Sequence, residues 1–322
     1  MLSDGFGRQF EYLRVSLTDV CNFSCQYCLP DGYQKTHKSR FLSSHEVLNL
    51  VEVFASLGTK KVRITGGEPS LRKDLSDIIA GIKQNQHIQT IALTTNGYKL
   101  TQNAQDWYNA GLDSVNVSVD SFDEHQFKVI TGSSKLKEIL LGIDRAIDVG
   151  LKVKINLVLM KQFNHKVLGQ VMQYIKDKPV SFRFIELMET GDNAIFFNQQ
   201  HVSPAGIQHS LIENGFVQTS RDKFSGPARV YSHQDYVGTI GLITPYASGF
   251  CDNCNRLRVS STGKVHLCLF AEKGYDIRWG LSDERKHELA SHIEALMPYK
   301  KPTHLLQEHK TGATTHLAML GG

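Results

Sequence analysis

The sequence lacks the features that would place it in several broad classes of protein. No stretch of about 18 or more consecutive residues is uniformly apolar, which excludes a transmembrane helix. The opening residues, MLSDGFGRQF, contain neither a basic segment nor an apolar core, so we expect no secretory signal and a cytoplasmic protein. A formal net charge of +4 over 322 residues is small for a general nucleic-acid binder. We therefore expect no membrane partner and no nucleic-acid partner.

Cysteine is scarce, and its distribution is informative. The six cysteines fall into two groups of three, and none is left over. The groups are Cys21, Cys25 and Cys28, and then Cys251, Cys254 and Cys268. A chain of this length does not need disulfides for stability, so clustered thiols without an export signal indicate metal ligation.

Six short runs rich in Val, Ile, Leu and Thr predict β-strands in the first 190 residues. They cover residues 11–18, 60–67, 90–96, 114–120, 151–160 and 180–188. Segments with apolar residues three and four apart separate these runs and predict helices. One helix has a capping box, Ser43 with Glu46, and ends at Gly58. Strand–helix alternation builds a parallel sheet through right-handed crossovers, so we predict an α/β fold, an incomplete (β/α)6-type TIM barrel.

The pattern changes after about residue 195. One predicted helix, 204–214, precedes short β-rich runs, and another, 283–296, precedes the tail. Thr262-Gly263 stands between alternating residues and predicts a hairpin. We predict a barrel core over residues 1–195 and a smaller C-terminal α+β portion over 196–322 that covers the barrel mouth.

The first cysteine group, CNFSCQYC, directly follows the first predicted strand. The carboxyl ends of barrel strands carry the chemistry in this fold, so the loop lies at the catalytic rim. Three thiolates can hold three irons of a four-iron cluster and leave the fourth iron open. A zinc site completed by a distant histidine is the alternative, although none of the 14 histidines stands at the usual knuckle spacing.

This motif, C-x3-C-x-Tyr-C on the first βα loop, resembles the signature of the radical S-adenosylmethionine enzymes. The resemblance implies a [4Fe-4S] cluster on Cys21, Cys25 and Cys28, and S-adenosylmethionine that is cleaved to a 5′-deoxyadenosyl radical. It extends to the segments GGEP, NVSVD and FIELM. The expected contacts of S-adenosylmethionine are Tyr27, Gly67, Ser118 and Met188.

The second cysteine group is spaced C-x2-C-x13-C, and the predicted hairpin returns Cys268 to the other two. A four-cysteine zinc ribbon lacks its fourth ligand here. A Cys3His zinc site that uses His266, or a zinc-ribbon nucleic-acid module, remains the alternative. Arg256 and Arg258 follow on one strand face, as alternation requires.

Together the two groups resemble the GTP 3′,8-cyclase family, which makes the first intermediate of molybdenum cofactor biosynthesis. The resemblance implies a second [4Fe-4S] cluster whose open iron contacts the guanine of GTP. The expected substrate contacts are Arg14, Arg63, Thr94, Lys154, Arg256, Leu257 and Arg258. The expected catalytic residues are Arg14, Arg256, Arg258, Gly321 and Gly322, with the terminal glycines threaded into the site.

The same resemblance implies further partners. They are a flavodoxin- or ferredoxin-like reductant and a downstream cyclic pyranopterin monophosphate synthase, and a homodimer is compatible with it. The alternative within the superfamily is a peptide-modifying maturase with an auxiliary cluster. Such maturases carry about seven cysteines in their C-terminal part, and this chain has three there.

Overall fold

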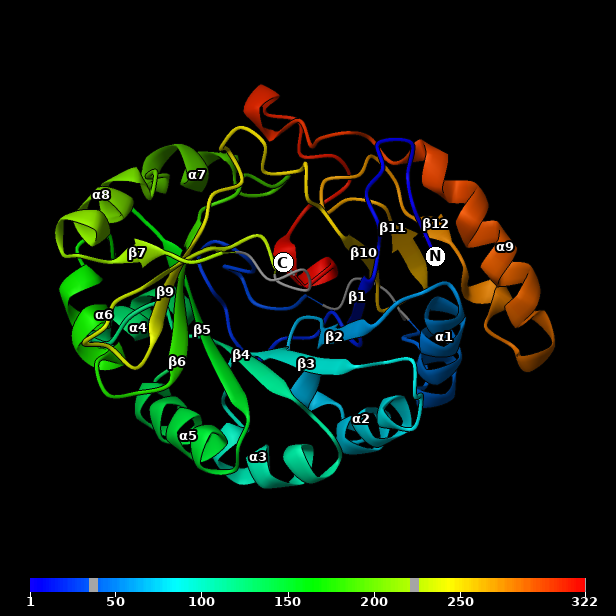
Figure 1. The fold of residues 1–322 in the computed structure, drawn as a ribbon, viewed down its shortest axis with the longest axis horizontal. Helices are drawn as coiled ribbons and strands as arrows, with labels where there is room; N and C mark the ends of the chain where they lie inside the picture. The colour runs from blue at the N-terminus through cyan, green and yellow to red at the C-terminus, as the bar shows by residue number, and fades with distance from the viewer. Residues whose placement is uncertain (35–39, 221–225, 322) are drawn as a thin grey trace.

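A computed structural model describes residues 1–34, 40–220 and 226–321 of the chain. Within these ranges, twelve strands form one curved sheet, an open barrel with helices on its outside (Figure 1). Among the described residues, no helix has the length and apolar character needed to cross a membrane.

The first six strands lie side by side in chain order and pair in parallel. They are β1 (Tyr12–Ser16), β2 (Lys61–Thr65), β3 (Thr90–Thr95), β4 (Ser114–Ser118), β5 (Lys152–Leu159) and β6 (Val180–Glu186). Each falls within a run predicted from the sequence. The predicted incomplete parallel barrel is therefore confirmed.

The helices between these strands pack on the outside of the sheet (Figure 1). They are α1 (Ser44–Ser56), α2 (Leu75–Lys83), α3 (Leu100–Asn109), α4 (Glu124–Thr131), α5 (Leu136–Asp148) and α6 (Leu168–Ile175). The predicted capping box is present: the Ser43 hydroxyl accepts from the backbone of Glu46, whose carboxylate accepts from the backbone of Ser43. Gly58 follows the helix at φ +98°, a conformation that favours glycine.

The C-terminal strands extend the barrel sheet at both edges. β9 (Thr239–Ile243) pairs in parallel with β6, and β10 (Arg256–Val259) pairs in parallel with β1. Outside them lie antiparallel strands: β8 (Arg229–Ser232), β7 (Val217–Gln218), β11 (Lys264–His266) and β12 (Tyr275–Asp276). β10 and β11 form the predicted hairpin, with Gly263 at φ +85°.

The separate α+β portion over the barrel mouth is not confirmed, because its strands continue the barrel sheet instead of building a second one. The edges of an open parallel sheet present unpaired N–H and C=O groups, and added strands satisfy them. The boundary at residue 195 stays a prediction.

The remaining helices are short. The α-helices are α7 (Ala194–Gln200), α8 (Ala205–Glu213) and α9 (Lys286–Leu296). The 3-10 helices are η1 (Pro69–Leu71), η2 (Arg278–Gly280), η3 (Asp283–Arg285), η4 (Met297–Tyr299), η5 (Leu306–Glu308) and η6 (Leu317–Met319). Figure 1 shows the C-terminal segment in the middle of the ring of strands.

Two hydrophobic clusters hold these parts together. The larger joins the barrel strands to the surrounding helices, with residues such as Leu13, Ile64 and Phe182 completely buried. The smaller joins Leu269, Phe270, Leu306, Leu317 and Leu320, and packs against the first cysteine loop. The tail is therefore attached to the barrel interior by its own apolar contacts.

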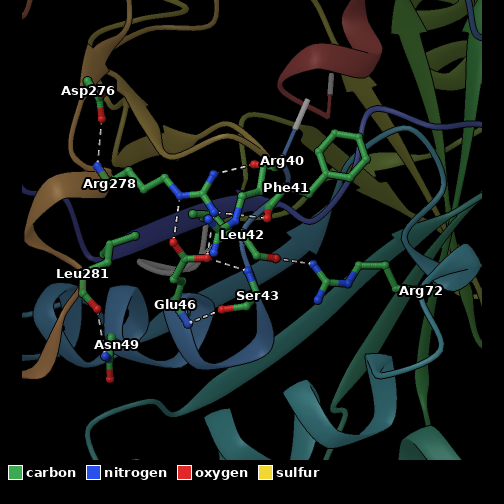
Figure 2. Close-up of polar contacts among 10 residues, drawn as sticks. All are labelled: Arg40, Phe41, Leu42, Ser43, Glu46, Asn49, Arg72, Asp276, Arg278 and Leu281. Carbon is green, nitrogen blue, oxygen red and sulfur yellow. Dashed lines mark hydrogen bonds and ion pairs between the residues drawn. The ribbon is translucent and has the colours of Figure 1, made fainter. Parts of the chain in front are cut away.

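Arg278 fastens the C-terminal part to the start of α1 (Figure 2). Its guanidinium pairs with both carboxylate oxygens of Glu46, at 2.7 and 2.9 Å, and also donates to the carbonyls of Arg40 and Phe41. Arg72 donates to the next carbonyl, that of Leu42, at 2.6 Å. These bonds hold the segment that enters α1 against both η2 and the second βα loop.

Candidate active site

Polar side chains from β10, β1 and β2 form two rows inside the barrel. The strand register aligns Arg256 with Tyr12 and Tyr12 with Lys61. Two residues further along, Arg258, Arg14 and Arg63 align in the same way. Because side chains alternate along a strand, the intervening residues face the hydrophobic core instead.

These rows line a cavity of about 1080 Å³, partly open to solvent, which we call the cationic cavity. Its lining contains seven Lys and Arg residues and, among the described residues, no Asp or Glu. The seven are Arg14, Lys61, Arg63, Lys154, Arg183, Arg256 and Arg258. Such a surplus of one charge in a concave site favours a polyanionic ligand, and guanidinium forks match phosphate oxygens.

Burial and mutual repulsion weaken the positive charges in this cavity. Burial, then the charges of Arg183 and Arg63, lower the pKa of Lys154 to about 7. Burial, then Arg256, lowers the pKa of Arg258 to about 10. Burial acts to raise the pKa of Tyr12, but the neighbouring cations outweigh it and lower this pKa to about 7. A bound anion would relieve this repulsion.

Several polar atoms in the lining have no hydrogen-bond partner among the described residues. They are Nε of Arg183 and the Oδ1 atoms of Asn116 and Asn156. Thr94, by contrast, accepts from Arg63 at 3.2 Å. Buried unsatisfied groups are costly, so this lining suits a ligand with both donors and acceptors.

The second cysteine group lies at one end of the cationic cavity. Cys251 and Cys254 precede β10, and the hairpin brings Cys268 back beside them. Burial acts to raise the pKa of Cys251, but the neighbouring residues His304 and Thr303 lower it to about 7. Burial also acts to raise the pKa of Cys254, but the charges of Arg256 and Lys300 outweigh it, so this pKa is lowered. The thiols of this loop therefore lie in surroundings that favour thiolate ligands.

The first cysteine group lines a second cavity of about 940 Å³, which we call the thiol cavity. All four residues expected to contact S-adenosylmethionine, Tyr27, Gly67, Ser118 and Met188, line it together with the three cysteines. Burial raises the pKa of Cys21 to about 11 and that of Cys28 to about 12. Burial thus favours the neutral thiols here, and a bound metal would provide the positive charge that stabilises them as thiolate ligands.

The GGEP turn packs tightly under the first cysteine loop. A Cβ on Gly66 would clash with the carbonyl oxygen of Thr18, and one on Gly67 would clash with that of Val20. The Glu68 carboxylate is buried and accepts bonds from Thr95 Oγ1 and the Asn96 backbone at 2.7 and 2.6 Å. Glycine is thus needed for the close approach of the two loops.

Tyr27 and Asp120 form a buried pair in the thiol cavity. The Tyr27 hydroxyl donates to Asp120 Oδ2 at 2.9 Å, and the Val158 backbone donates to Oδ1 at 2.8 Å. Burial raises the pKa of Asp120 to about 6, against these hydrogen bonds. Asp120 fixes the aromatic ring beside the cysteines.

The two cavities share a wall made by residues of β3, β5 and β6 and of the segment after β6. Thr94, Asn156, Ile185 and Met188 line both. Ligands in the two cavities would therefore lie next to each other along these shared residues.

The described end of the tail contacts two of the cavity arginines. Arg14 donates to the carbonyl of Gly321, and Arg258 donates to the carbonyls of Leu320 and Gly321 at 3.3 and 3.5 Å. Gly321 has φ +57°, and a Cβ there would clash with the Thr65 side chain. Gly322, the last expected catalytic residue, lies outside the described residues.

One expected contact is placed differently, and some cavity residues were not expected. The Leu257 side chain is 1% exposed and belongs to the hydrophobic core, because it alternates with the two arginines. Lys61, Tyr12 and Arg183 line the cationic cavity but were not predicted. Strand alternation could have identified them, since each stands two residues from another inward-facing residue on the same strand.

No three His, Cys, Asp or Glu side chains in the described ranges converge on one metal-ion position, and His266 is in no such group. The thiolates of a four-iron cluster each bind a different iron, so a cluster does not require that convergence. In both groups, three thiols stand at the edge of a cavity large enough for a further ligand. The donor sets fit four-iron clusters.

Comparisons with known families cover almost the whole chain. The Radical SAM superfamily matches residues 15–175, and the Molybdenum Cofactor Synthesis C family matches residues 180–306. Among solved structures, SuiB from Streptococcus suis bound to S-adenosylmethionine aligns with a TM-score of 0.62 at 13% identity, covering 90% of this chain and 69% of that one. SuiB bound to the precursor peptide SuiA aligns with a TM-score of 0.61 at 14% identity, covering 90% and 67%. At these identities the likeness concerns the fold alone.

Curated relatives are much more similar. A GTP 3′,8-cyclase from Psychromonas ingrahamii is 52% identical over 324 residues, covering 100% of this chain and 95% of the relative. The GTP 3′,8-cyclases of Cronobacter sakazakii and Yersinia pestis are 50% and 49% identical, each covering 100% of this chain and 99% of the relative. The chain therefore belongs to the GTP 3′,8-cyclase family of radical S-adenosylmethionine enzymes.

Proposed function

We propose that this protein converts GTP to 3′,8-cyclo-7,8-dihydro-GTP with S-adenosylmethionine, the first step of molybdenum cofactor biosynthesis. The observation that carries the proposal is the pair of adjoining cavities, each bordered by three cysteines, of which one has a cationic lining without carboxylates among the described residues. Family membership, at about 50% identity over the full chain, supports the same reaction.

The cysteines would hold two [4Fe-4S] clusters. Cys21, Cys25 and Cys28 would hold the first, and Cys251, Cys254 and Cys268 the second. When bound, the first supplies the electron that cleaves S-adenosylmethionine, and the second supplies an open iron for a purine atom. The superfamily match supports the first cluster, and the three cysteines that line the cationic cavity together support the second.

The cationic cavity would hold the triphosphate of GTP. Arg63, Lys154 and Arg256, together with the unpredicted Lys61 and Arg183, provide the charge. Thr94 and Met188 in the shared wall would keep the ribose carbon beside the thiol cavity, so that the hydrogen atom moves over a short path. The residues of this wall are half-buried, and the two bound ligands would cover the rest of it and exclude water from the carbon radical.

Arg14 would act late in the reaction. Its guanidinium lies between Arg258 and Arg63 in register, and its pKa is lowered by burial and by Arg258. Because its positive charge is disfavoured, this guanidinium can supply a proton to the reduced cyclic product or stabilise that product by a hydrogen bond. The Gly321 carbonyl, held by Arg14 and Arg258, would align both groups.

Further partners follow from this reaction. Reduction of the first cluster needs an electron carrier, for which a flavodoxin- or ferredoxin-like protein is suited, and the product would pass to a cyclic pyranopterin monophosphate synthase. Oxygen-sensitive thiolate clusters fit a reducing compartment such as the cytoplasm. A homodimer stays an expectation.

One anaerobic experiment tests the proposal. The reconstituted protein is incubated with GTP, S-adenosylmethionine and dithionite, and the products are separated by liquid chromatography and mass spectrometry. We expect 5′-deoxyadenosine and a cyclised isomer of GTP, because the hydrogen atom taken from C3′ is replaced by one electron and one proton. This isomer has the mass of GTP and a different retention time. Cleavage of S-adenosylmethionine with GTP unchanged would contradict the proposal and favour a peptide-modifying maturase.

A further inference from the structure

A turn at the N-terminus, residues 3–9, is held by buried polar contacts of its own. An isolated bridge between Ser3 and Gln9 closes it. The Asp4 carboxylate accepts from the backbone N–H groups of Phe6 and Arg8, both at 3.0 Å. Its second oxygen pairs with Arg8 Nε at 2.7 Å, and both side chains are buried. The carboxylate therefore fixes the direction in which the guanidinium points.

The other Arg8 nitrogens bind backbone carbonyls from two distant segments. Nη1 donates to the carbonyl of Cys251 at 3.1 Å and to that of Pro302 at 2.6 Å. Nη2 donates to the carbonyl of Lys301 at 2.7 Å. One guanidinium thus joins the N-terminal turn, the second cysteine loop and residues 300–304. The guanidinium can bind all these groups at once because its N–H donors are arranged in a planar fork, whereas a lysine ammonium is a point charge with fewer donors.

Residues 300–304 also contact the remainder of the second cysteine group. The buried Lys300 ammonium donates to the carbonyl of Leu267, the residue before Cys268. The His304 side chain lies beside the Cys251 thiol, and both residues line the cationic cavity. The separation between the loop of Cys251 and residues 300–304 therefore depends on Arg8, which bonds to both.

We propose that the Asp4–Arg8 pair is a positioning unit for the second cysteine group, which sets the geometry in which Cys251, Cys254 and Cys268 hold an iron–sulfur cluster. The inference rests on the second cluster of the proposed function. Neither residue lines the cationic cavity or the thiol cavity, so the pair acts on the reaction through the cysteine loop.

The test compares Arg8→Ala and Arg8→Lys with the parent protein, all reconstituted anaerobically. The readouts are iron and sulfide per chain, the electron paramagnetic resonance spectrum of the reduced protein, and cleavage of S-adenosylmethionine without GTP. We expect about eight irons in the parent and about four in Arg8→Ala, with one of two cluster signals lost. Cleavage of S-adenosylmethionine stays at the parent rate, and Arg8→Lys, which keeps the charge without the fork, has an intermediate iron content.

Arg278→Ala is the matched control. Arg278 also binds a carboxylate and backbone carbonyls, but none of these belongs to the second cysteine group or to residues 300–304 (Figure 2). We expect this variant to keep about eight irons. If Arg8→Ala does not fold, Arg8→Lys decides by the same readouts.

Two outcomes would overturn the inference. One is a full iron content and an unchanged spectrum in both Arg8 variants. The other is an equal loss of iron in Arg278→Ala, which would show general destabilisation. A parent protein with only about four irons would instead contradict the second cluster of the proposed function.

Discussion

Lys154 and Tyr12 both have a pKa of about 7, Lys154 through burial and neighbouring cations and Tyr12 through the cations alone. Burial and the neighbouring charges of Arg183 and Arg63 lower the pKa of Lys154 to about 7. The pKa of Tyr12 also falls to about 7, against the effect of burial. The cavity thus limits its own positive charge. A triphosphate favours the ammonium form of Lys154, so we expect its binding to take up protons.

This linkage predicts a pH dependence of GTP affinity. The bound pKa of Lys154 lies above its free value of about 7, so the gain in affinity is complete below pH 7 and is lost as pH rises through the bound pKa. Above about pH 7.5 a triphosphate has lost its last proton and no longer titrates. In that range we expect the dissociation constant of GTP to rise by up to tenfold per pH unit.

Isothermal titration calorimetry in two buffers of different ionisation enthalpy measures the proton uptake. Lys154→Gln is the control, and it should bind GTP more weakly and take up fewer protons, with the remaining uptake due to Tyr12. Equal uptake in the parent and in this variant would contradict the assignment.

Both the backbone conformation of Gly321 and the packing around it require glycine at this position of the tail. Its φ of +57° and the close approach of Thr65 Oγ1 to the place that a Cβ would take leave no space for alanine. We expect Gly321→Ala to displace the tail and to lower product formation at least ~10-fold, with little change in melting temperature because tails contribute little to global stability. Gly169→Ala, where a Cβ meets nothing within 4 Å, is the control. Equal turnover in the two variants would show that the tail is passive.

At the scale of elements, the sequence predicted the strands and the cysteine loops well, because apolar runs, turn residues and thiol spacing are local signals. It predicted the β10–β11 hairpin from Thr262-Gly263 for the same reason. The parallel pairing of β1 with β10 was not predicted, because it joins segments about 240 residues apart and no local pattern specifies it. That pairing is what aligns Arg256 with Tyr12 and makes the inward rows. The Leu257 side chain faces the core because it alternates with the two arginines, and its contact with the substrate stays a prediction.

Arg278 provides an element-scale prediction. It is partly exposed, and its loss removes a bidentate pair with Glu46 and bonds to two backbone carbonyls at the start of α1. We expect Arg278→Ala to lower the free energy of unfolding by about 1–2 kcal/mol, a value reduced for solvent screening. Urea denaturation followed by circular dichroism measures it. Lys137→Ala, which breaks the exposed pair with Glu124, should cost no more than about 0.5 kcal/mol, and a similar cost in both would contradict the fastening role.

At the scale of the whole molecule, the open barrel places the two cysteine groups in two separate cavities that share a wall. The first βα loop provides the cysteines of the thiol cavity, and the β10–β11 hairpin, nearly at the other end of the chain, provides those of the cationic cavity. β1 and β10 pair in parallel, so the first cysteine group, after β1, and the second, before β10, stand at opposite ends of these strands, with the arginine rows between them. Thr94, Asn156, Ile185 and Met188 then form a common wall. Radical generation and substrate binding can thus be separated by mutation.

Replacing one cysteine in each group tests this separation. We expect Cys268→Ala to hold about four irons and to cleave S-adenosylmethionine slowly without forming cyclised product, because the thiol cavity is intact while purine binding is lost. Cys25→Ala should keep about four irons, those of the second group, and should neither cleave S-adenosylmethionine nor form product, although its cationic cavity still binds GTP with an affinity close to that of the parent. Iron assays, 5′-deoxyadenosine release and equilibrium binding of GTP distinguish the variants. Product formation by Cys268→Ala at the parent rate would show that the second group has no part in the reaction. Loss of GTP binding in Cys25→Ala would show that the two cavities do not act separately.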